Sequence, residues 1–313
     1  MVRCGKSPGP IERFVSLSPG QTKVDSVNLL VNEYTYMGGG VGVGDFNRDG
    51  LTDLFFTGNQ VSSKLYLNRS HVAKTNKVQT TILFEDVTQP AGVQTRFWCT
   101  GVSVIDINQD GWLDIYVCTS AVGKPSHNLL FVNDGKPKAG NVPTFTEAAA
   151  AYGLANTGFS TQAAFLDYDK DGDLDVFLLR NKLGGENPND IRPNVPDPTD
   201  SSADKLYRNE GVLAGRGHPV FQDVSQQAGI QGGGYGPGLA VTDFNQDGWP
   251  DLYVGNDCLW LNKQDGTFTN TAPQSLRHQN YSTMGVDAAD LNNDGRPDLV
   301  TLDMLPEVNE RKK

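Results

Sequence analysis

The sequence has few of the residues that most catalytic and transition-metal sites need. Only four histidines are scattered along its 313 residues, namely His71, His127, His218 and His278. There is no His-Glu-x-x-His motif and no Gly-x-Ser-x-Gly motif, so nothing supports zinc-protease or α/β-hydrolase chemistry. The four cysteines show no metal-ligand spacing.

Other common signals are missing as well. No apolar run is long enough to cross a membrane as a helix, and no complete secretory signal opens the chain. No stretch has convincing helical periodicity. There is no basic stripe, and the net charge is −11, so we do not expect nucleic acid as a partner. The 35 glycines and a hydrophobic content of 37% are typical of a turn-rich β protein.

One acidic phrase of nine residues, Asp-x-Asn/Asp-x-Asp-Gly-x-x-Asp, occurs five times. We call the copies loops 1 to 5; they span Asp45–Asp53, Asp106–Asp114, Asp167–Asp175, Asp243–Asp251 and Asp290–Asp298. The phrase explains the negative charge, because five divalent ions would add ten positive charges and nearly neutralise the chain.

Each loop has the residues to surround a hard cation with oxygen. Side chains at positions one, three, five and nine can converge with the carbonyl of position seven, and the glycine at position six permits the turn. Calcium accepts about six to eight such oxygens, whereas zinc and copper prefer histidine or cysteine. We therefore predict up to five calcium ions.

The predicted ligands are Asp45, Asn47, Asp49, Leu51 and Asp53; Asp106, Asn108, Asp110, Trp112 and Asp114; Asp167, Asp169, Asp171, Asp173 and Asp175; Asp243, Asn245, Asp247, Trp249 and Asp251; and Asp290, Asn292, Asp294, Arg296 and Asp298. Loop 3 offers four carboxylates and should bind most tightly. An EF-hand needs a glutamate at position twelve, which none of the loops has. Plain turn formation is the alternative, but five copies with one spacing favour the metal.

The loops belong to a longer repeat. Their starts lie 61, 61, 76 and 47 residues apart, a period typical of propellers. In the first period a small-residue segment, 40–43, precedes the loop, and apolar segments follow at 53–56, 65–68 and 84–88. Four short segments per period predict an all-β fold, a β-propeller of four-stranded antiparallel blades with five visible repeats. The small first segment fits the crowded place nearest the axis.

The phrase Gly-Val-x-Val-x-Asp-Phe-Asn-x-Asp-Gly-x-x-Asp-Leu around loop 1 resembles FG-GAP and VCBS-type repeats. The resemblance covers about residues 34–305. It implies an integrin-α-like propeller with calcium in the loop between the first two strands of a blade. Residues 39–68 and 301–307 are also similar to bacterial relatives of the cartilage acidic protein (UnbV-containing) group.

That family implies about seven blades. We therefore expect the chain to be a fragment of a larger propeller; in the alternative, a strand at Phe14–Ser18 closes a five-bladed ring. The predicted domains are an N-terminal segment, 1–33, with one strand, and the propeller, 34–313. An insertion rich in proline, asparagine and aspartate, 182–204, is either a functional loop or a disordered excursion.

Calcium loops of this kind suit an extracellular or cell-envelope protein, because extracellular modules operate with sites of about 0.1–1 mM affinity. The export leader is then absent from this chain. Cys4 would serve as the lipid anchor of a bacterial lipoprotein, or it is an incidental cysteine, since its flanks fit a lipobox poorly. Cys99 and Cys118 fall on neighbouring predicted strands, where we favour buried thiols over a disulfide.

Aromatic residues precede each loop by eight or nine positions, on the face that we expect opposite the loops. The predicted ligand-binding residues are Tyr36, Trp98, Phe159, Tyr235 and Tyr281, with Arg96 and His278 nearby. They could stack on sugar rings or grip a peptide. Alternatively, they pack between blades.

These features favour a calcium-stabilised extracellular module that binds or scaffolds, with a glycan or an envelope protein as partner, and not an enzyme. A calcium-dependent carbohydrate-active enzyme of the lyase or dehydratase kind is the alternative, which analogy of fold keeps open. A purely structural protein-interaction surface is a third interpretation.

Overall fold

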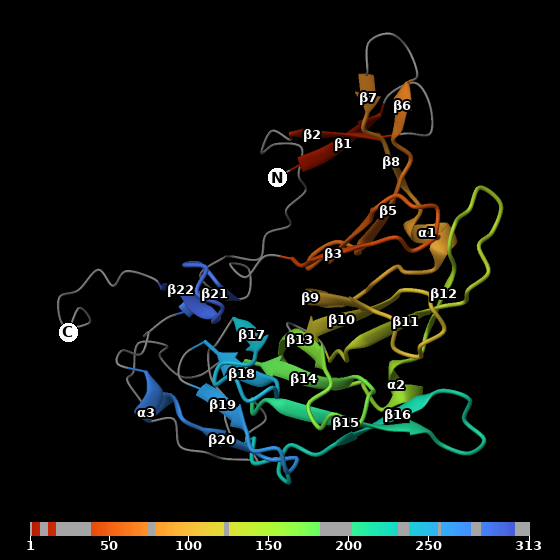
Figure 1. The fold of residues 1–313 in the computed structure, drawn as a ribbon. Coiled ribbons are helices and arrows are strands. Elements are labelled where there is room, and N and C mark those ends of the chain that lie inside the picture. The colour runs from red at the N-terminus through yellow and green to blue at the C-terminus, as the bar shows by residue number, and fades with distance from the viewer. Residues whose placement is uncertain are drawn as a thin grey trace. The chain divides into compact units, whose positions relative to one another are not determined.

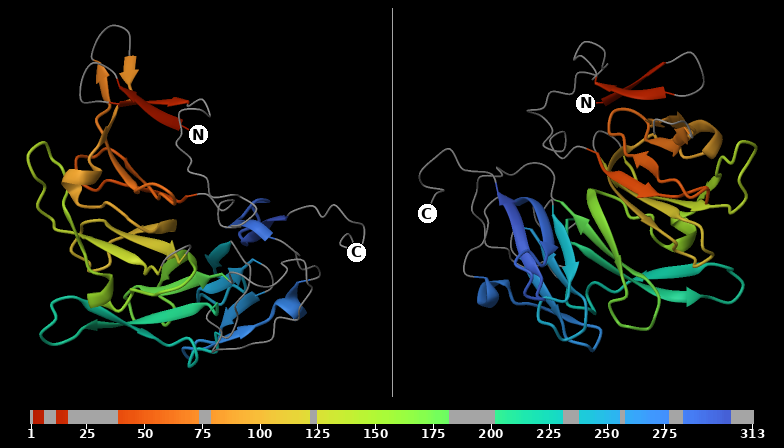
Figure 2. Two further views of the ribbon diagram at one scale, coloured as in Figure 1. Left: turned by 180° about the vertical axis from the view of Figure 1, so that it is seen from behind. Right: turned by 45° about the horizontal axis from the view of Figure 1, so that its top comes forward.

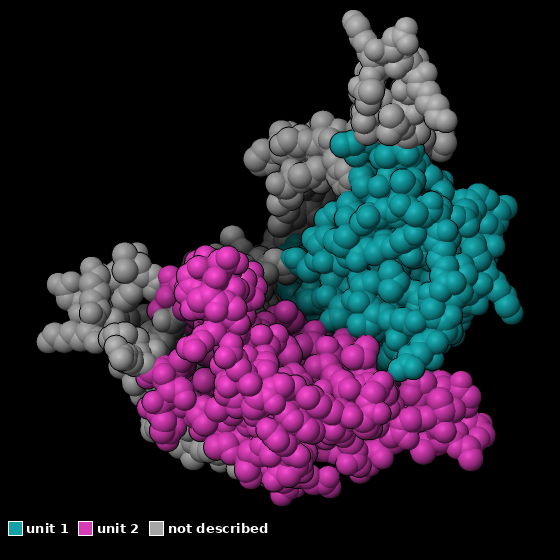
Figure 3. Space-filling view, viewed as in Figure 1, with its two compact units in different colours: residues 1–155 teal, residues 156–313 magenta. Residues whose placement is uncertain are grey.

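The computed structural model describes residues 2–6, 12–16, 39–73, 79–121, 125–181, 202–230, 238–255, 258–276 and 283–303. The chain divides into two compact units, residues 1–155 and 156–313 (Figure 3). The described residues form an all-β fold of antiparallel sheets with three one-turn helices (Figure 1). None of these helices is long and apolar enough to span a membrane.

Unit 1 holds two large sheets, one per loop. The first has the order β1 (Val2–Lys6), β2 (Glu12–Ser16), β8 (Phe84–Asp86), β5 (Lys64–Asn68), β4 (Asp53–Phe56) and β3 (Val41–Gly44). The second has the order β12 (Phe145–Glu147), β11 (Leu129–Asn133), β10 (Asp114–Ser120) and β9 (Trp98–Ile105). The remaining elements are a hairpin, β6 (His71–Ala73) with β7 (Gln79–Thr81), and helices α1 (Thr88–Ala91) and α2 (Ala149–Tyr152).

Unit 2 repeats this plan, and its strands lie side by side in Figures 1 and 2. One sheet contains β13 (Ser160–Leu166), β14 (Asp175–Arg180), β15 (Lys205–Val212) and β16 (Pro219–Asp223). The next contains β17 (Leu239–Thr242), β18 (Asp251–Val254), β19 (Cys258–Asn262) and β20 (Phe268–Asn270), followed by helix α3 (Ala272–Ser275). A two-stranded sheet pairs β21 (Thr283–Ala289) with β22 (Asp298–Asp303).

Small residues in the first strands let successive sheets of one unit approach each other closely. In β3, a Cβ on Gly42 would lie 2.8 Å from the side chain of Val104 in β9, and one on Gly44 would lie 2.7 Å from the side chain of Leu113. A larger residue at either position would clash. In unit 2, a Cβ on Gly238 would lie 2.5 Å from Val286 of β21. This stacking of antiparallel sheets through their first strands is the propeller-like arrangement that the repeats predict.

The second strands lie between covered faces, which explains their apolar runs. All seven residues of β10 and all six of β14 are buried. Each unit has a core between its sheets, around Phe55 and Ile115 in unit 1 and around Phe177 and Leu252 in unit 2. Each such side chain contributes about 1.5–3 kcal/mol by leaving water.

The strand predictions for the first period are confirmed to within about two residues, the usual uncertainty of an element's end. Two features differ. Helices α1 to α3 were not expected, because a single turn is too short to show periodicity. In residues 1–33, where one strand was predicted, the structure has β1 and β2, and β2 pairs with β8 through Glu12 and Phe84. Most of the predicted insertion lies outside the described residues.

Candidate calcium centres

All five loops join the first strand of a sheet to the second. Position one follows the first strand directly, and position nine opens the second, as in the link from β3 to β4. Position six is a glycine with φ between 83° and 97° in every loop, which confirms the turn predicted there. Position four is also left-handed, which the sequence did not reveal; its residues are Arg48, Gln109, Lys170, Gln246 and Asn293, with φ between 56° and 61°.

The acidic side chains of a loop converge on one short turn of backbone. In loop 1 the Asp45 carboxylate accepts hydrogen bonds from the amides of Asp49 at 3.1 Å and Gly50 at 2.8 Å. The side-chain oxygen of Asn47 accepts from the Asp49 amide at 3.2 Å, and Asp49 accepts from the Leu51 amide at 2.9 Å. Loops 2, 4 and 5 make the same four bonds. The predicted side-chain ligands at positions one, three and five are thus brought together.

Loop 3 has the geometry closest to a cation site. One carboxylate oxygen each from Asp167, Asp169 and Asp175 lie within 4.8 Å of one another. The Oδ1 atoms of Asp167, Asp169 and Asp173 are buried without a hydrogen-bond partner. Buried carboxylate oxygens need a donor or a cation. These residues therefore fit a hard cation bound through oxygen.

The electrostatics of loop 3 agree with an excess of carboxylate. Burial raises the pKa of Asp175 to about 8, and the charges of Asp169 and Asp173 act in the same direction. Hydrogen bonds from the amides of Asn209 and Tyr168 lower it in part. Burial and the charge of Asp171 raise the pKa of Asp173 to about 6. A divalent ion would reverse this balance by favouring the charged carboxylates.

The carboxyl at position nine has a structural role that the sequence analysis missed. In loop 2, Asp114 is fully buried and accepts two hydrogen bonds, from the amide of Ile107 at 3.0 Å and from that of Asn133 at 2.7 Å. Asn133 ends β11, the third strand of the sheet. This carboxyl therefore fastens the loop to the sheet through both of its oxygens.

The same fastening recurs in three other loops. The buried carboxyls there are Asp53, Asp175 and Asp251. Each accepts a hydrogen bond of 2.8 Å from a backbone amide of the third strand, donated by Asn68, Asn209 and Asn262 respectively. An asparagine near the end of every third segment was the signal in the sequence. Its side-chain oxygen accepts the amide two residues later, for example that of Gly135 at 3.1 Å from Asn133, which explains the residue type.

Position seven was predicted to offer its carbonyl, a role that remains a prediction. The residue type at this position varies between the loops. Trp112 lies beneath the guanidinium of Arg48, with 4.4 Å from Cζ to the ring centroid. Trp249 lies beneath Lys170, with 4.7 Å from Nζ to the ring centroid.

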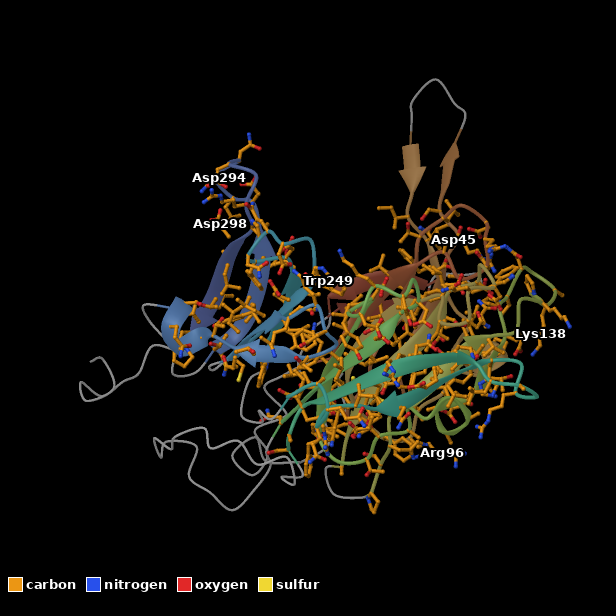
Figure 4. The ribbon with its side chains drawn as sticks, turned by 60° about the horizontal axis from the view of Figure 1, so that its bottom comes forward. Asp45, Arg96, Lys138, Trp249, Asp294 and Asp298 are labelled. Atoms are coloured by element: carbon orange, nitrogen blue, oxygen red, sulfur yellow. The ribbon has the colours of Figure 1, made fainter. Side chains whose placement is uncertain are left out.

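The predicted ligand face is described only in part. Tyr36, Tyr235, Tyr281 and His278 lie outside the described residues. Trp98 is 7% exposed, so its ring is covered by protein, while Phe159 is half-buried and Arg96 is exposed. Figure 4 labels Arg96 and Asp45, which lie well apart in that view.

The cysteines in the described core form no disulfide. Cys99 and Cys118 are buried and not bonded to each other, which confirms the favoured prediction, and Cys258 is likewise a buried thiol. Burial raises the pKa of the Cys99 and Cys118 thiols. They pack as small apolar residues.

One buried carboxyl lies away from the loops. Asp204, just before β15, is 2% exposed and accepts a hydrogen bond from the Arg180 amide at 2.8 Å. Burial raises its pKa to about 8, although that hydrogen bond and the Arg180 charge act in the opposite direction. At the same place in the second sheet, Asn128 accepts from the Thr119 amide at 2.9 Å. The repeat thus accepts a neutral residue in this role.

Replacing Asp204 with asparagine should make the protein less sensitive to alkaline pH. The folded state holds a proton on Asp204 up to about pH 8, whereas the unfolded state loses it near 3.8. The parent's free energy of unfolding therefore falls as the pH rises between these values. Asparagine does not titrate. The free energy of unfolding of the variant, relative to that of the parent, should therefore rise by about 1–2 kcal/mol from pH 6 to pH 8. Urea unfolding at both pH values checks this, and a pH-independent difference would contradict it.

Comparisons with known proteins agree with this architecture. The FG-GAP-like repeat family matches residues 45–117 and 255–301, and the FG-GAP repeat family matches residues 235–266. The chain therefore contains FG-GAP repeats over these residues.

Its relatives include cartilage acidic protein 1. The mouse protein is 24% identical, over 85% of this chain and 40% of its own length. The human protein is 24% identical, over 64% of this chain and 29% of its own length. The chain thus spans less than half of these relatives. A solved structure, the biofilm matrix protein Bap1 of V. cholerae, is similar with a TM-score of 0.40 and 15% identity, covering 84% of this chain and 34% of that one.

Proposed function

We propose that the chain is a calcium-stabilised extracellular module that binds or scaffolds a glycan or protein partner. The observation that carries the proposal is loop 3, where three carboxylates share one centre and three buried oxygens have no partner. Loops of the same sequence and backbone geometry stand at the same place in four further sheets. FG-GAP repeats, moreover, resemble the calcium-binding repeats of integrins.

Calcium would act as a structural ion. In each loop it would be held by the side chains of positions one, three, five and nine and the carbonyl of position seven. Its positive charge would neutralise carboxylates that otherwise repel one another. The loop residues would supply preformed geometry, since the turn at positions four to six is held by hydrogen bonds from backbone amides to the carboxylate at position one, as in loop 1.

We place the protein outside the cell or in the cell envelope. The similarity to cartilage acidic protein 1 and the FG-GAP repeats support this location. The abundance of calcium there suits loops of moderate affinity. Attachment through a lipid on Cys4 belongs to the same proposal, and intact-mass measurement of the natural product would test it.

Binding fits the described residues better than catalysis. A hydrolytic or eliminating enzyme needs titratable groups that converge away from the metal loops. The described carboxyls whose pKa is raised lie in the loops, apart from Asp204, which is buried against backbone. We propose the face that carries Arg96 as the contact surface. Glycan-array binding or capture of an envelope protein would support it, and polysaccharide cleavage by the pure protein would favour the enzyme instead.

Native mass spectrometry in calcium tests the proposal directly. The protein should take up as many as five calcium ions, and magnesium at equal concentration should not displace them, because it demands a tighter octahedron. Absence of bound calcium at about 1 mM, the weak end of extracellular sites, would contradict the proposal.

The loops should differ in affinity, with loop 3 the tightest. Replacing Asp171 with alanine removes one of the four carboxylates predicted as ligands in loop 3, whereas the matched change at Asp294 removes one of three from the exposed loop 5. We expect the loss of calcium-dependent stability to be larger for Asp171→Ala by about 1 kcal/mol, on the scale of one ligand's charge. Thermal unfolding with and without calcium measures this, and equal losses would contradict the ranking.

A further inference from the structure

Loop 1 reaches across to loop 2 within unit 1. Arg48, the left-handed residue at position four, donates from Nη2 to the carbonyl of Gly111, which is position six of loop 2. Its guanidinium also covers the ring of Trp112 at position seven. One side chain of loop 1 thus holds the turn that aims the predicted carbonyl ligand of loop 2.

The loops of unit 2 are joined in the same direction. Lys170 at position four of loop 3 lies over the ring of Trp249 at position seven of loop 4. Gln246 at position four of loop 4 donates to the carbonyl of Gly295, position six of loop 5, at 3.2 Å. Figure 4 labels Trp249 and, in loop 5, Asp294 and Asp298. The glutamine link shows that the connection does not depend on a positive charge.

A second connection runs through the core. The Phe46 carbonyl, at position two of loop 1, accepts a hydrogen bond from Nδ2 of Asn133 at 3.0 Å. The backbone amide of the same asparagine donates to the carboxyl of Asp114, position nine of loop 2, at 2.7 Å. The Phe46 ring also packs edge-on against Phe145 of the second sheet, with centroids 6.1 Å apart. A single residue, Asn133, therefore links a predicted ligand of loop 2 to loop 1.

Unit 2 repeats this core connection between loops 3 and 4. The Tyr168 carbonyl accepts from Nδ2 of Asn262 at 2.8 Å, and the Asn262 amide donates to Asp251 at 2.8 Å. The Tyr168 ring contacts Phe268 with centroids 5.9 Å apart. The recurrence of both connections in a second unit shows that they belong to the repeat.

We propose that neighbouring loops of one unit fill with cations cooperatively, loop 1 with loop 2 and loop 3 with loops 4 and 5. This inference rests on the proposed function. An ion in loop 1 would fix the turn from which Arg48 projects and the carbonyl that Asn133 holds. Loop 2 would then lose less conformational freedom when its own ion binds, which is positive coupling without a change of fold. The coupling must be reciprocal, and values of about 5–150-fold are typical.

Terbium luminescence can follow loop 2 alone. Tryptophan occupies position seven in loops 2 and 4, whereas loops 1, 3 and 5 have Leu51, Asp173 and Arg296 there. In the full chain carrying Trp249→Phe, Tb³⁺ emission excited through Trp112 reports loop 2. The same chain with Trp112→Phe as well gives the background from the other tryptophans. Calcium is then added to displace Tb³⁺.

Three variants of that chain test the coupling. Asp45→Asn with Asp49→Asn disables loop 1, and we expect the Tb³⁺ midpoint of loop 2 to rise at least about fivefold. Arg48→Asn should raise it about two- to fivefold, because asparagine tolerates the left-handed backbone, as Asn293 does in loop 5, but is too short to reach Gly111. The matched control, Asp290→Asn with Asp294→Asn, removes the same two charges from unit 2 and should leave the midpoint unchanged.

The outcomes separate the two proposals. If Tb³⁺ binds loop 2 with the same midpoint in both loop 1 variants as in the parent, the coupling is wrong and the calcium-binding proposal stands. Absence of any tryptophan-sensitised emission that calcium displaces would overturn the proposed function. Arg48→Asn keeps every predicted ligand, so it gives an answer even where the double variant fails to fold.

Discussion

Removing calcium should lower the thermal midpoint of unfolding by more than about 10 °C. A site filled at a hundred times its dissociation constant stabilises the folded state by about 2.7 kcal/mol, so two filled loops already contribute about 5 kcal/mol. For domains of this size, each kcal/mol shifts the midpoint by about 2–4 °C. The reason is local: without an ion, each loop keeps three to five carboxylates beside one turn.

Calorimetry in calcium and in excess chelator measures this shift. Restoring calcium should recover the original midpoint, while magnesium should recover little of it. The result that would count against structural calcium is a midpoint that is the same in all three buffers.

Replacing Asp114 with alanine should cost about 3–5 kcal/mol in chelator, where no ion contributes. The substitution leaves the buried amides of Ile107 and Asn133 without an acceptor. Each unsatisfied buried group costs about 1–3 kcal/mol, and lost packing adds to that. Loop 2 would also lose a predicted ligand, so the deficit should widen when calcium is present.

Asp298→Ala is the matched control for that experiment. Asp298 holds the same position in loop 5, but it is half-exposed, and the hydrogen bond that it accepts from Leu291, at 3.0 Å, is exposed to solvent. Its loss should cost less than about 1 kcal/mol. Urea unfolding of both variants in chelator decides the matter. Equal losses would show that the buried hydrogen bonds of Asp114 do not stabilise the fold.

The sequence predicted the loops well because their geometry is local. Nine residues specify both the turn and the order of its oxygens, and the glycine at position six forms the predicted turn, with a positive φ, in all five copies. The strands followed because apolar segments and turn residues alternate with a constant order. These signals need no knowledge of distant parts of the chain.

The features that were missed depend on distant partners. Asp114 meets Asn133 only because β10 and β11 pair in one register, and nothing within the nine-residue phrase specifies that partner. The pairing of Glu12 with Phe84 is likewise long-range. The left-handed backbone at position four escaped because arginine, glutamine, lysine and asparagine all occur there, and no shared residue type marks it.

The hydrogen bond that the Asn133 amide donates to the Asp114 carboxyl has an evolutionary consequence. Because this hydrogen bond needs no ion, we expect a repeat that has lost the carboxylates at positions one, three and five to keep the link between its loop and its third strand. The calcium affinity of a loop and the stability of its sheet can then change independently during evolution. Degenerate repeats in related proteins should preserve the ninth aspartate and the third-strand asparagine long after the rest of the phrase has decayed.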